Sequence, residues 1–144
     1  MEKLNDVIFY TIEKAIKSYR QYAQKQIKKA GFDITIDQWL VMKCLIDNPD
    51  IQLQDLAKSV FKDNASVTRI IDLLIRKNYL KRQSHEGDGR RSTFVITEDG
   101  LKTIDAITLI VLQNRKHALK SINQSETIAT NNTLQKIISN CILK

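Results

Sequence analysis

Residues 53–96 constrain the fold of this chain more than any other stretch. Two short segments with apolar residues at helical spacing are followed by two β-prone runs around a loop with two glycines. The spacing predicts a short helix from Gln52 to Val60, and then a second helix that either Asp63 or Asn64 caps. The order helix, helix, hairpin predicts a winged helix-turn-helix unit.

The second of these helices has two different faces. Its apolar face carries Val67, Ile70, Ile71 and Leu74, and its opposite face carries Ala65, Thr68, Arg69, Asp72 and Arg76. Asn78 can take the left-handed conformation that ends such a helix. The β-prone runs at residues 79–84 and 92–96 then form the hairpin, or wing.

Long helices are expected on both sides of this unit, because the chain has one proline and four glycines. Apolar spacings of three and four predict one helix from Leu4 to about Gly31, and Thr35 and Gln38 form a capping box for the next. Beyond the wing, helices are expected from Thr97 to about residue 122 and around residues 134–141.

The expected fold is therefore mainly α with a small β-hairpin wing. Residues 35–97 form the winged helix-turn-helix domain, and residues 1–34 and 98–144 form a helical dimerisation region. The terminal helices carry wide apolar faces that a small winged domain cannot cover, so a second copy is expected to cover them. A two-fold homodimer would place two recognition helices about one DNA turn (~34 Å) apart.

The charge of the chain is distributed unevenly around a net value of +7. Residues 32–61 carry two basic and five acidic side chains, a balance of −3, whereas residues 62–91 carry eight basic and four acidic, a balance of +4. A basic surface on the second helix and the wing is what contact with phosphates requires. A solvated face of a lysine-rich protein would show the same pattern.

The second helix of a helix-turn-helix enters the major groove of double-stranded DNA with its N-terminal residues. Ser66 and Thr68 can offer hydroxyls to phosphates or base edges, and Arg69 can donate two hydrogen bonds to a guanine. The DNA-binding residues expected on this helix are Asn64, Ala65, Ser66, Thr68, Arg69 and Arg76. In the alternative interpretation, Ser66 and Thr68 are early helix residues that only face solvent.

The tip of the wing carries a second set of expected DNA contacts. Arg90 and Arg91 are long enough to enter a minor groove, whose narrowed form attracts arginine. Asp88 repels phosphate, so we expect it to orient an arginine through an ion pair. A purely solvated turn is the alternative.

The run from Asn64 to Arg82, followed by the run from Gly87 to Gly100, resembles the MarR family of bacterial transcriptional regulators. The family signature combines an "(S/T)-V-T-R" recognition start, a "D-x-R" wing and an "(L/I)-T-x-x-G" entry to the next helix. Asn78 departs from the family, which usually has glycine there. The resemblance implies a homodimer on a palindromic operator, usually a repressor, often released by a small anionic or phenolic ligand or by thiol oxidation.

The sensing part of the sequence is less clearly marked. A ligand pocket would lie between the winged domain and the dimer helices, with Tyr19, Trp39, Met42 and His117 as candidate liners. Aromatic residues at helical spacing more often belong to the core. Cys44 falls on an apolar face and is expected in the core, whereas Cys141 could lie at the dimer interface and form a disulfide across it. Oxidation-sensing members of the family carry a cysteine in the first helix, and this chain has none there.

Other function classes find little support in the sequence. It contains no nucleophile elbow, phosphate loop, paired-carboxylate cleft or metal-ligand cluster, so neither an enzyme nor a cofactor nor a metal site is expected. No apolar run approaches the ~20 residues of a membrane span, and no secretory signal is visible, which predicts a cytoplasmic protein. The alternative function is a winged-helix adaptor or architectural DNA-binding protein without sequence-specific regulation.

Overall fold

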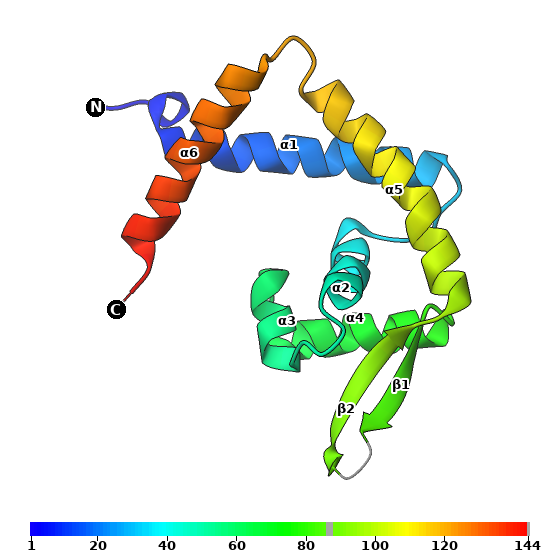
Figure 1. The fold of residues 1–144 in the computed structure, drawn as a ribbon. Helices are drawn as coiled ribbons and strands as arrows, with labels where there is room; N and C mark the ends of the chain where they lie inside the picture. Colours follow the sequence, from blue (N-terminus) through cyan, green and yellow to red (C-terminus); the bar gives the residue numbers. More distant parts are fainter. Residues whose placement is uncertain (86–87, 144) are drawn as a thin grey trace. The chain divides into compact units, whose positions relative to one another are not determined.

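The computed structural model describes the backbone of residues 1–85 and 88–143, and the side chains of residues 1–84 and 93–143. The described part is mainly helical, with one two-stranded antiparallel sheet (Figure 1). The expected fold class, a winged helix-turn-helix between longer helices, is confirmed. The elements are a 3-10 turn (Leu4–Asp6), α1 (Ile8–Lys29), α2 (Ile36–Asp47), α3 (Leu53–Ser59), α4 (Asn64–Arg76), β1 (Leu80–His85), β2 (Asp88–Ile96), α5 (Glu98–Ala118) and α6 (Gln124–Cys141).

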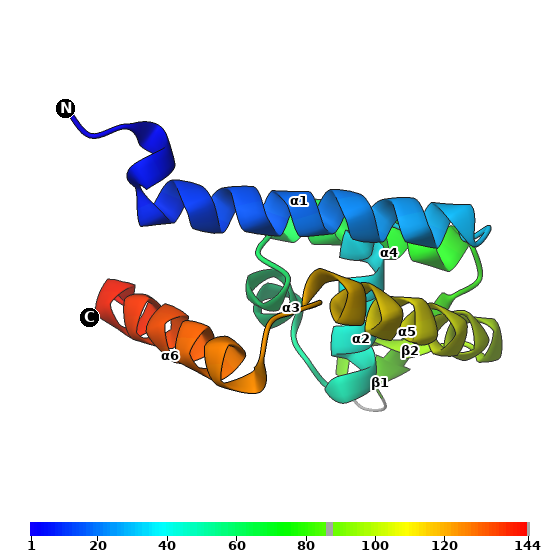
Figure 2. The ribbon, with the colours of Figure 1, turned by 90° about the horizontal axis from the view of Figure 1, so that it is seen from above.

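The chain divides into two compact units, Met1–Asn114 and Arg115–Lys144. The first unit contains α1 to α4, the wing and most of α5, and the C-terminal half of α1 lies beside α5 (Figures 1 and 2). The second unit contains the last turn of α5 and the whole of α6. No residue of α6 is buried.

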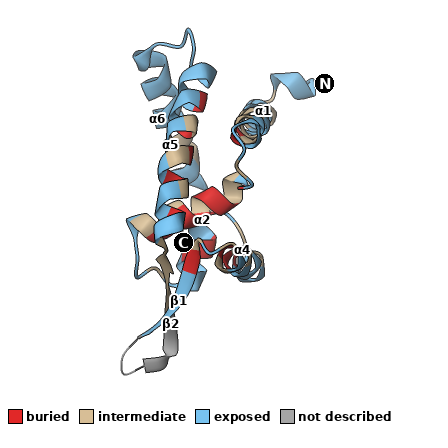
Figure 3. Cartoon of the chain, turned by 90° about the vertical axis from the view of Figure 1, so that its right-hand side faces the viewer, coloured by how far each residue is buried: buried red, intermediate tan, exposed pale blue. Residues whose placement is uncertain are grey.

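The core lies in the first unit, where α2 packs against α1, α3, α4 and β2. Buried side chains, red in Figure 3, come mainly from α2, α4 and α5. The most deeply buried are Val41 and Met42 of α2, Val67 and Leu74 of α4, and Ile107 of α5. Helix α2 is apolar around most of its circumference, which fits its being covered on several sides. Helix α4 buries only one face, and its other face is polar.

Polar contacts fix the turn between α1 and α2. Gly31 takes a left-handed conformation (φ 92°) just after α1, close to the predicted end of that helix. Gln24 of α1 then bonds the next segment twice: its Nε2 donates to the Ile34 carbonyl, and its Oε1 accepts from the Ile36 N–H, both at 3.0 Å. Thr35 and Gln38 form the predicted capping box at the start of α2.

The base of the wing is joined to both neighbouring helices. Asn78 has the predicted left-handed conformation (φ 65°) after α4, and its Nδ2 donates to Asp99 Oδ2 of α5 at 3.1 Å. The Thr97 hydroxyl donates to the Asn78 carbonyl (2.6 Å) and accepts from the Gly100 N–H (3.0 Å). Gly100 packs against the Tyr79 carbonyl so closely that a Cβ atom would collide with it. These contacts explain the T-x-x-G sequence at the start of α5.

Several element boundaries differ from those predicted. The first helix does not run unbroken from Leu4, because Val7 is extended and separates a 3-10 turn from α1. Helix α5 ends at Ala118 rather than near residue 122, and α6 begins at Gln124, well before Leu134, after a capping box of Asn123 and Glu126. Strand β1 (Leu80–His85) is displaced by one residue from the predicted run at residues 79–84, and β2 is longer than the predicted run at residues 92–96, since it begins at Asp88.

Candidate nucleic-acid interface

Helix α4 has the cap and the two faces expected of a recognition helix. Asp63, rather than Asn64, is the N-cap: its Oδ1 accepts from the Ser66 N–H at 2.7 Å. This hydrogen bond from the Ser66 backbone lowers the pKa of Asp63 below its ordinary value. The inner face buries Val67, Ile71 and Leu74. Asn64, Ala65, Thr68, Arg69 and Arg76 are exposed, whereas Ser66 is half-buried.

The polar residues at the start of α4 are partly engaged with one another. The Thr68 hydroxyl donates to the Asn64 carbonyl at 2.8 Å, so its proton is used within the helix and its oxygen is left to accept. Arg69 Nη2 donates to Ser66 Oγ at 3.3 Å. This hydrogen bond holds the Arg69 side chain at the N-terminal end of α4. Because a guanidinium has five N–H donors, most of them are left for another partner.

A hollow of about 310 Å³ lies beside this end of α4. It is lined by Thr35, Asp37, Lys62, Ser66, Arg69, Ile70 and Leu73. Two cations, Lys62 and Arg69, therefore flank the beginning of the recognition helix, where the helix dipole also favours an anion. Lys62 is not among the residues predicted to bind DNA; the structure adds it to the cations at this end of α4.

Arg82 of β1, which is likewise not among the predicted DNA contacts, connects the wing to α4. Its Nη2 lies 4.0 Å from Asp72 Oδ1, and its guanidinium lies 5.5 Å from the centre of the Phe94 ring. Arg82 and Phe94 are opposite each other in the hairpin register. The ion pair with Asp72 therefore joins the wing to the polar face of α4.

The remaining predicted DNA contacts lie in the wing. The side chains of Asp88, Arg90 and Arg91 fall outside the described residues, so their expected roles stay predictions. The backbone places all of them on β2, which begins at Asp88. They therefore belong to the strand rather than to the loop in which the sequence placed them.

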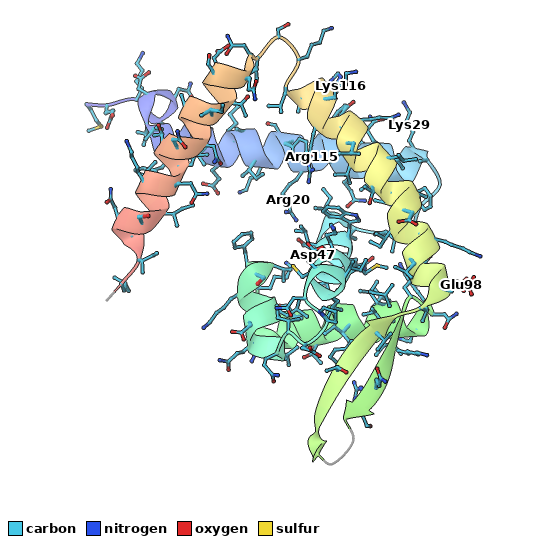
Figure 4. All side chains as sticks on the ribbon, in the orientation of Figure 1. Arg20, Lys29, Asp47, Glu98, Arg115 and Lys116 are labelled. Atoms are coloured by element: carbon cyan, nitrogen blue, oxygen red, sulfur yellow. The ribbon has the colours of Figure 1, made fainter. Side chains whose placement is uncertain are left out.

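An ion-pair cluster connects α1 to the segment that precedes α4. Asp37, near the start of α2, accepts from Arg20 Nη2 of α1 at 2.5 Å and lies 3.1 Å from Lys62 Nζ through its other oxygen. Figure 4 shows Arg20 between α1 and α2. Burial raises the pKa of Asp37, but hydrogen bonds from Arg20 and Lys62 outweigh it, and the net pKa is lowered. Asp37 is therefore a carboxylate that holds two cations from different parts of the fold.

The candidate ligand-binding residues differ in burial and lie in different parts of the fold. Trp39 and Met42 are buried in the core, Tyr19 is half-buried on α1, and His117 is exposed in the second unit. An open cavity of about 750 Å³ runs along α1 and α2, and its lining includes Arg20, Lys25 and Lys28.

The two cysteines have different environments. Cys44 is half-buried against the core, and burial raises the pKa of its thiol. Cys141 is exposed at the end of α6. Among the described residues, no cluster of three or more His, Cys, Asp or Glu side chains could hold a metal ion, and no helix is long and apolar enough to cross a membrane.

The chain is similar to known transcriptional regulators in sequence and in fold. Residues 34–92 match the MarR family. The chain is 26% identical over 137 residues to the HTH-type transcriptional regulator SarZ of Staphylococcus haemolyticus, an alignment that covers 93% of this chain and 86% of the relative.

Two solved structures share the fold closely. The structure of the S. aureus MepR-DNA complex has a TM-score of 0.82 and 21% identity, over 94% of this chain and 97% of that one. Bordetella bronchiseptica BpsR, described with a mechanism for regulation of its DNA binding by 6-hydroxynicotinic acid, has a TM-score of 0.84 and 20% identity, over 95% and 96%. The matched segment spans α2 to the wing, where the capped, two-faced helix and its hairpin lie. Residues 34–92, from α2 to the wing, therefore carry the winged helix-turn-helix domain of the MarR family of transcriptional regulators.

Proposed function

We propose that this protein acts as a homodimer that binds a palindromic operator in double-stranded DNA sequence-specifically and represses transcription. The observation that carries the proposal is the start of α4, where Asn64, Ala65, Thr68 and Arg69 are exposed and Ser66 holds the Arg69 side chain. An arginine held at the N-terminal end of such a helix can donate two hydrogen bonds to a guanine in the major groove. Arg76 and the wing residues Asp88, Arg90 and Arg91 complete the proposed surface.

The homodimer is supported by apolar surface that the chain leaves uncovered. Phe9 and Ile16 of α1 and Leu109 of α5 are all at least half exposed, with Leu109 at 65%. Helix α6 has 18 residues and buries none of them, although most of the stability of a helix in a protein comes from packing of an amphipathic face. We infer that residues 1–34 and 98–144 form the dimerisation region and that residues 35–97 form the DNA-reading domain.

Release by a small anionic or phenolic ligand is part of the proposal. The cavity along α1 and α2 supports it, because Arg20 lines this cavity and also pairs with Asp37. An anion in the cavity would compete with Asp37 for the Arg20 guanidinium. Since Asp37 also holds Lys62, that competition would act on the segment that leads into α4.

The proposal is tested by replacing Arg69. The Arg69→Ala variant should lose about 1–3 kcal/mol, or roughly 5–150-fold, on its operator, and its preference should relax at one position of each half-site. Arg115→Ala is a matched control, because Arg115 is also an exposed arginine but lies on α5. Equal losses of Arg69→Ala on operator and random DNA would instead favour an architectural DNA-binding protein without sequence-specific regulation.

A further inference from the structure

The hydroxyl of Thr68, on the polar face of α4, is an acceptor without a free proton. Its Oγ1 donates to the Asn64 carbonyl, one helical turn earlier, at 2.8 Å. Threonine favours this kind of side-chain conformation in a helix. A hydroxyl has a single proton and two lone pairs, so Thr68 can only accept a hydrogen bond from an outside partner. Because Thr68 is exposed, such a partner can reach it.

This restriction limits what Thr68 can contact on double-stranded DNA. Phosphate oxygens only accept hydrogen bonds, so they form none with a hydroxyl whose proton is already used. The donors in the major groove are the N6 amino group of adenine and the N4 amino group of cytosine. Guanine N7 and O6, adenine N7 and thymine O4 are all acceptors. With α4 in the major groove, Thr68 is therefore matched to a base that carries an amino group.

The methyl groups beside this hydroxyl distinguish adenine from cytosine. Ala65 is exposed and lies three residues before Thr68, so the two side chains are neighbours on the helix surface. Ala65 Cβ and Thr68 Cγ2 provide two methyl groups next to the acceptor. An A·T pair presents both an amino group and the thymine methyl group in the major groove, whereas a G·C pair presents an amino group and no methyl group. An A·T pair therefore matches both features of this surface.

Arg69 sets the distance between this pair and a guanine. Its Nη2 donates to Ser66 Oγ at 3.3 Å, and the proposed function assigns its guanidinium to a guanine. Ala65 lies four residues before Arg69, so these side chains are also neighbours, with Cβ atoms about 5–6 Å apart. Base pairs follow one another every ~3.4 Å along the duplex, so this separation corresponds to about one or two base pairs.

We propose that Thr68 and Ala65 select an A·T pair in each half-site, about one or two base pairs from the guanine that Arg69 contacts. Thr68 Oγ1 accepts from adenine N6, and the two methyl groups contact the thymine methyl group. The inference rests on the proposed function, since it requires α4 in the major groove, and it adds the identity of a second base pair in the operator.

The test begins with selection of duplexes from a random pool by the full-length protein and by its Arg69→Ala and Thr68→Val variants. Valine keeps a methyl group and the shape of threonine but has no hydroxyl. The position at which Thr68→Val loses its base preference should hold an A·T pair. This pair should lie about one or two base pairs from the guanine whose preference is lost in Arg69→Ala.

Base analogues in the selected duplex then test each contact separately. Purine in place of adenine lacks the N6 amino group and should weaken wild-type binding about 3–10-fold, as expected for one hydrogen bond. Thr68→Val should bind the adenine and purine duplexes equally. Uracil in place of thymine lacks the methyl group and should weaken wild-type binding about threefold. Thr68→Ser keeps the hydroxyl and loses the methyl group, so it should retain the adenine preference and reduce the thymine preference.

Thr133→Val is the matched control. Thr133 of α6 is exposed, and its hydroxyl donates to the Ala129 carbonyl, four residues earlier, at 3.0 Å. Both valine variants therefore remove the same kind of hydrogen bond from an exposed threonine. Thr133→Val should keep the wild-type ratio of affinities for the adenine and purine duplexes, because a change in dimer stability would affect both duplexes alike.

Three results would overturn the inference. They are a G·C pair at the Thr68-dependent position, the same selected sequence for wild type and Thr68→Val, and equal adenine-to-purine affinity ratios for these two proteins. If the selected site still contains a guanine that depends on Arg69, each of these results leaves the proposed function standing. A wild-type protein that enriches no common sequence would overturn the proposed function and this inference together.

Discussion

The ion-pair cluster at Asp37 makes a prediction about stability that the structure can quantify. Asp37→Asn removes the charge that holds Arg20 and Lys62 and keeps one oxygen that can accept a hydrogen bond. The side chains of Asp37 and Lys62 are each 30% exposed, so the contacts lie between the exposed and the buried cases. Exposed pairs contribute roughly 0.2–1 kcal/mol, and breaking a buried pair costs roughly 3–5 kcal/mol.

We therefore expect Asp37→Asn to lower the free energy of unfolding by about 1–2 kcal/mol at neutral pH, which corresponds to about 3–8 °C in Tm for a chain of this size. Asp47→Asn is the matched control. Asp47 also lies on α2 and pairs with Lys43 at 2.9 Å, but that pair is exposed and joins residues of the same helix (Asp47 is labelled in Figure 4). Its loss should change Tm by about 1 °C or less.

The pH dependence of the difference in Tm provides a second check. The folded pKa of Asp37 is lowered, so its contribution is fully present above the unfolded value of about 3.9 and is lost as pH falls through the folded pKa. Thermal unfolding of both proteins between pH 7 and pH 3 should show the Tm difference shrinking below about pH 4. An Asp37→Asn protein as stable as the wild type at pH 7 would refute the reasoning, as would a difference that stays constant down to pH 3.

Three further predictions concern the wing, its base and the dimer. Gly100→Ala should lower the free energy of unfolding by about 1–3 kcal/mol, because the added Cβ atom would collide with the Tyr79 carbonyl and lie 2.9 Å from Ile96 Cγ2. Helix propensity alone would instead raise the Tm, so a raised Tm would contradict this prediction. Replacing Arg90 and Arg91 with alanine should weaken DNA binding and reduce the slope of log K against log salt by about 0.9 for each lost phosphate contact, and an unchanged slope would reject their role. Sedimentation should give a dimer at micromolar concentration and a shift toward monomer for Leu109→Glu, whereas a folded wild-type monomer would rule out the dimer.

Local signals in the sequence were sufficient to predict the fold class. Thr35 with Gln38 marked the start of α2, and Asn78 marked the end of α4 although the family usually has glycine there. These features are visible because capping and left-handed turns depend on residues close in sequence. The same kind of signal is present at Asn123 and Glu126, but the last helix was predicted from the apolar spacing farther along α6, so its start was placed too late.

Contacts between distant residues could not be predicted in the same way. Arg20, Asp37 and Lys62 come from three separate segments, and only the packing of α1, α2 and the turn before α4 brings them together. Phe61 could not be predicted for a different, local reason: it is left-handed (φ 63°) and 88% exposed in the turn after α3. No local rule predicts such a conformation for a phenylalanine, because bulky residues rarely adopt it.

The most direct test of the central claim is selection of bound DNA by the purified protein from a pool of random duplexes. A homodimer that reads DNA with two copies of α4 should enrich an inverted repeat whose half-site centres lie about one helical turn, or about 10 base pairs, apart. Arg69→Ala should lose the preference at one position in each half. The account would be contradicted if the wild-type protein bound duplex DNA but enriched no common sequence.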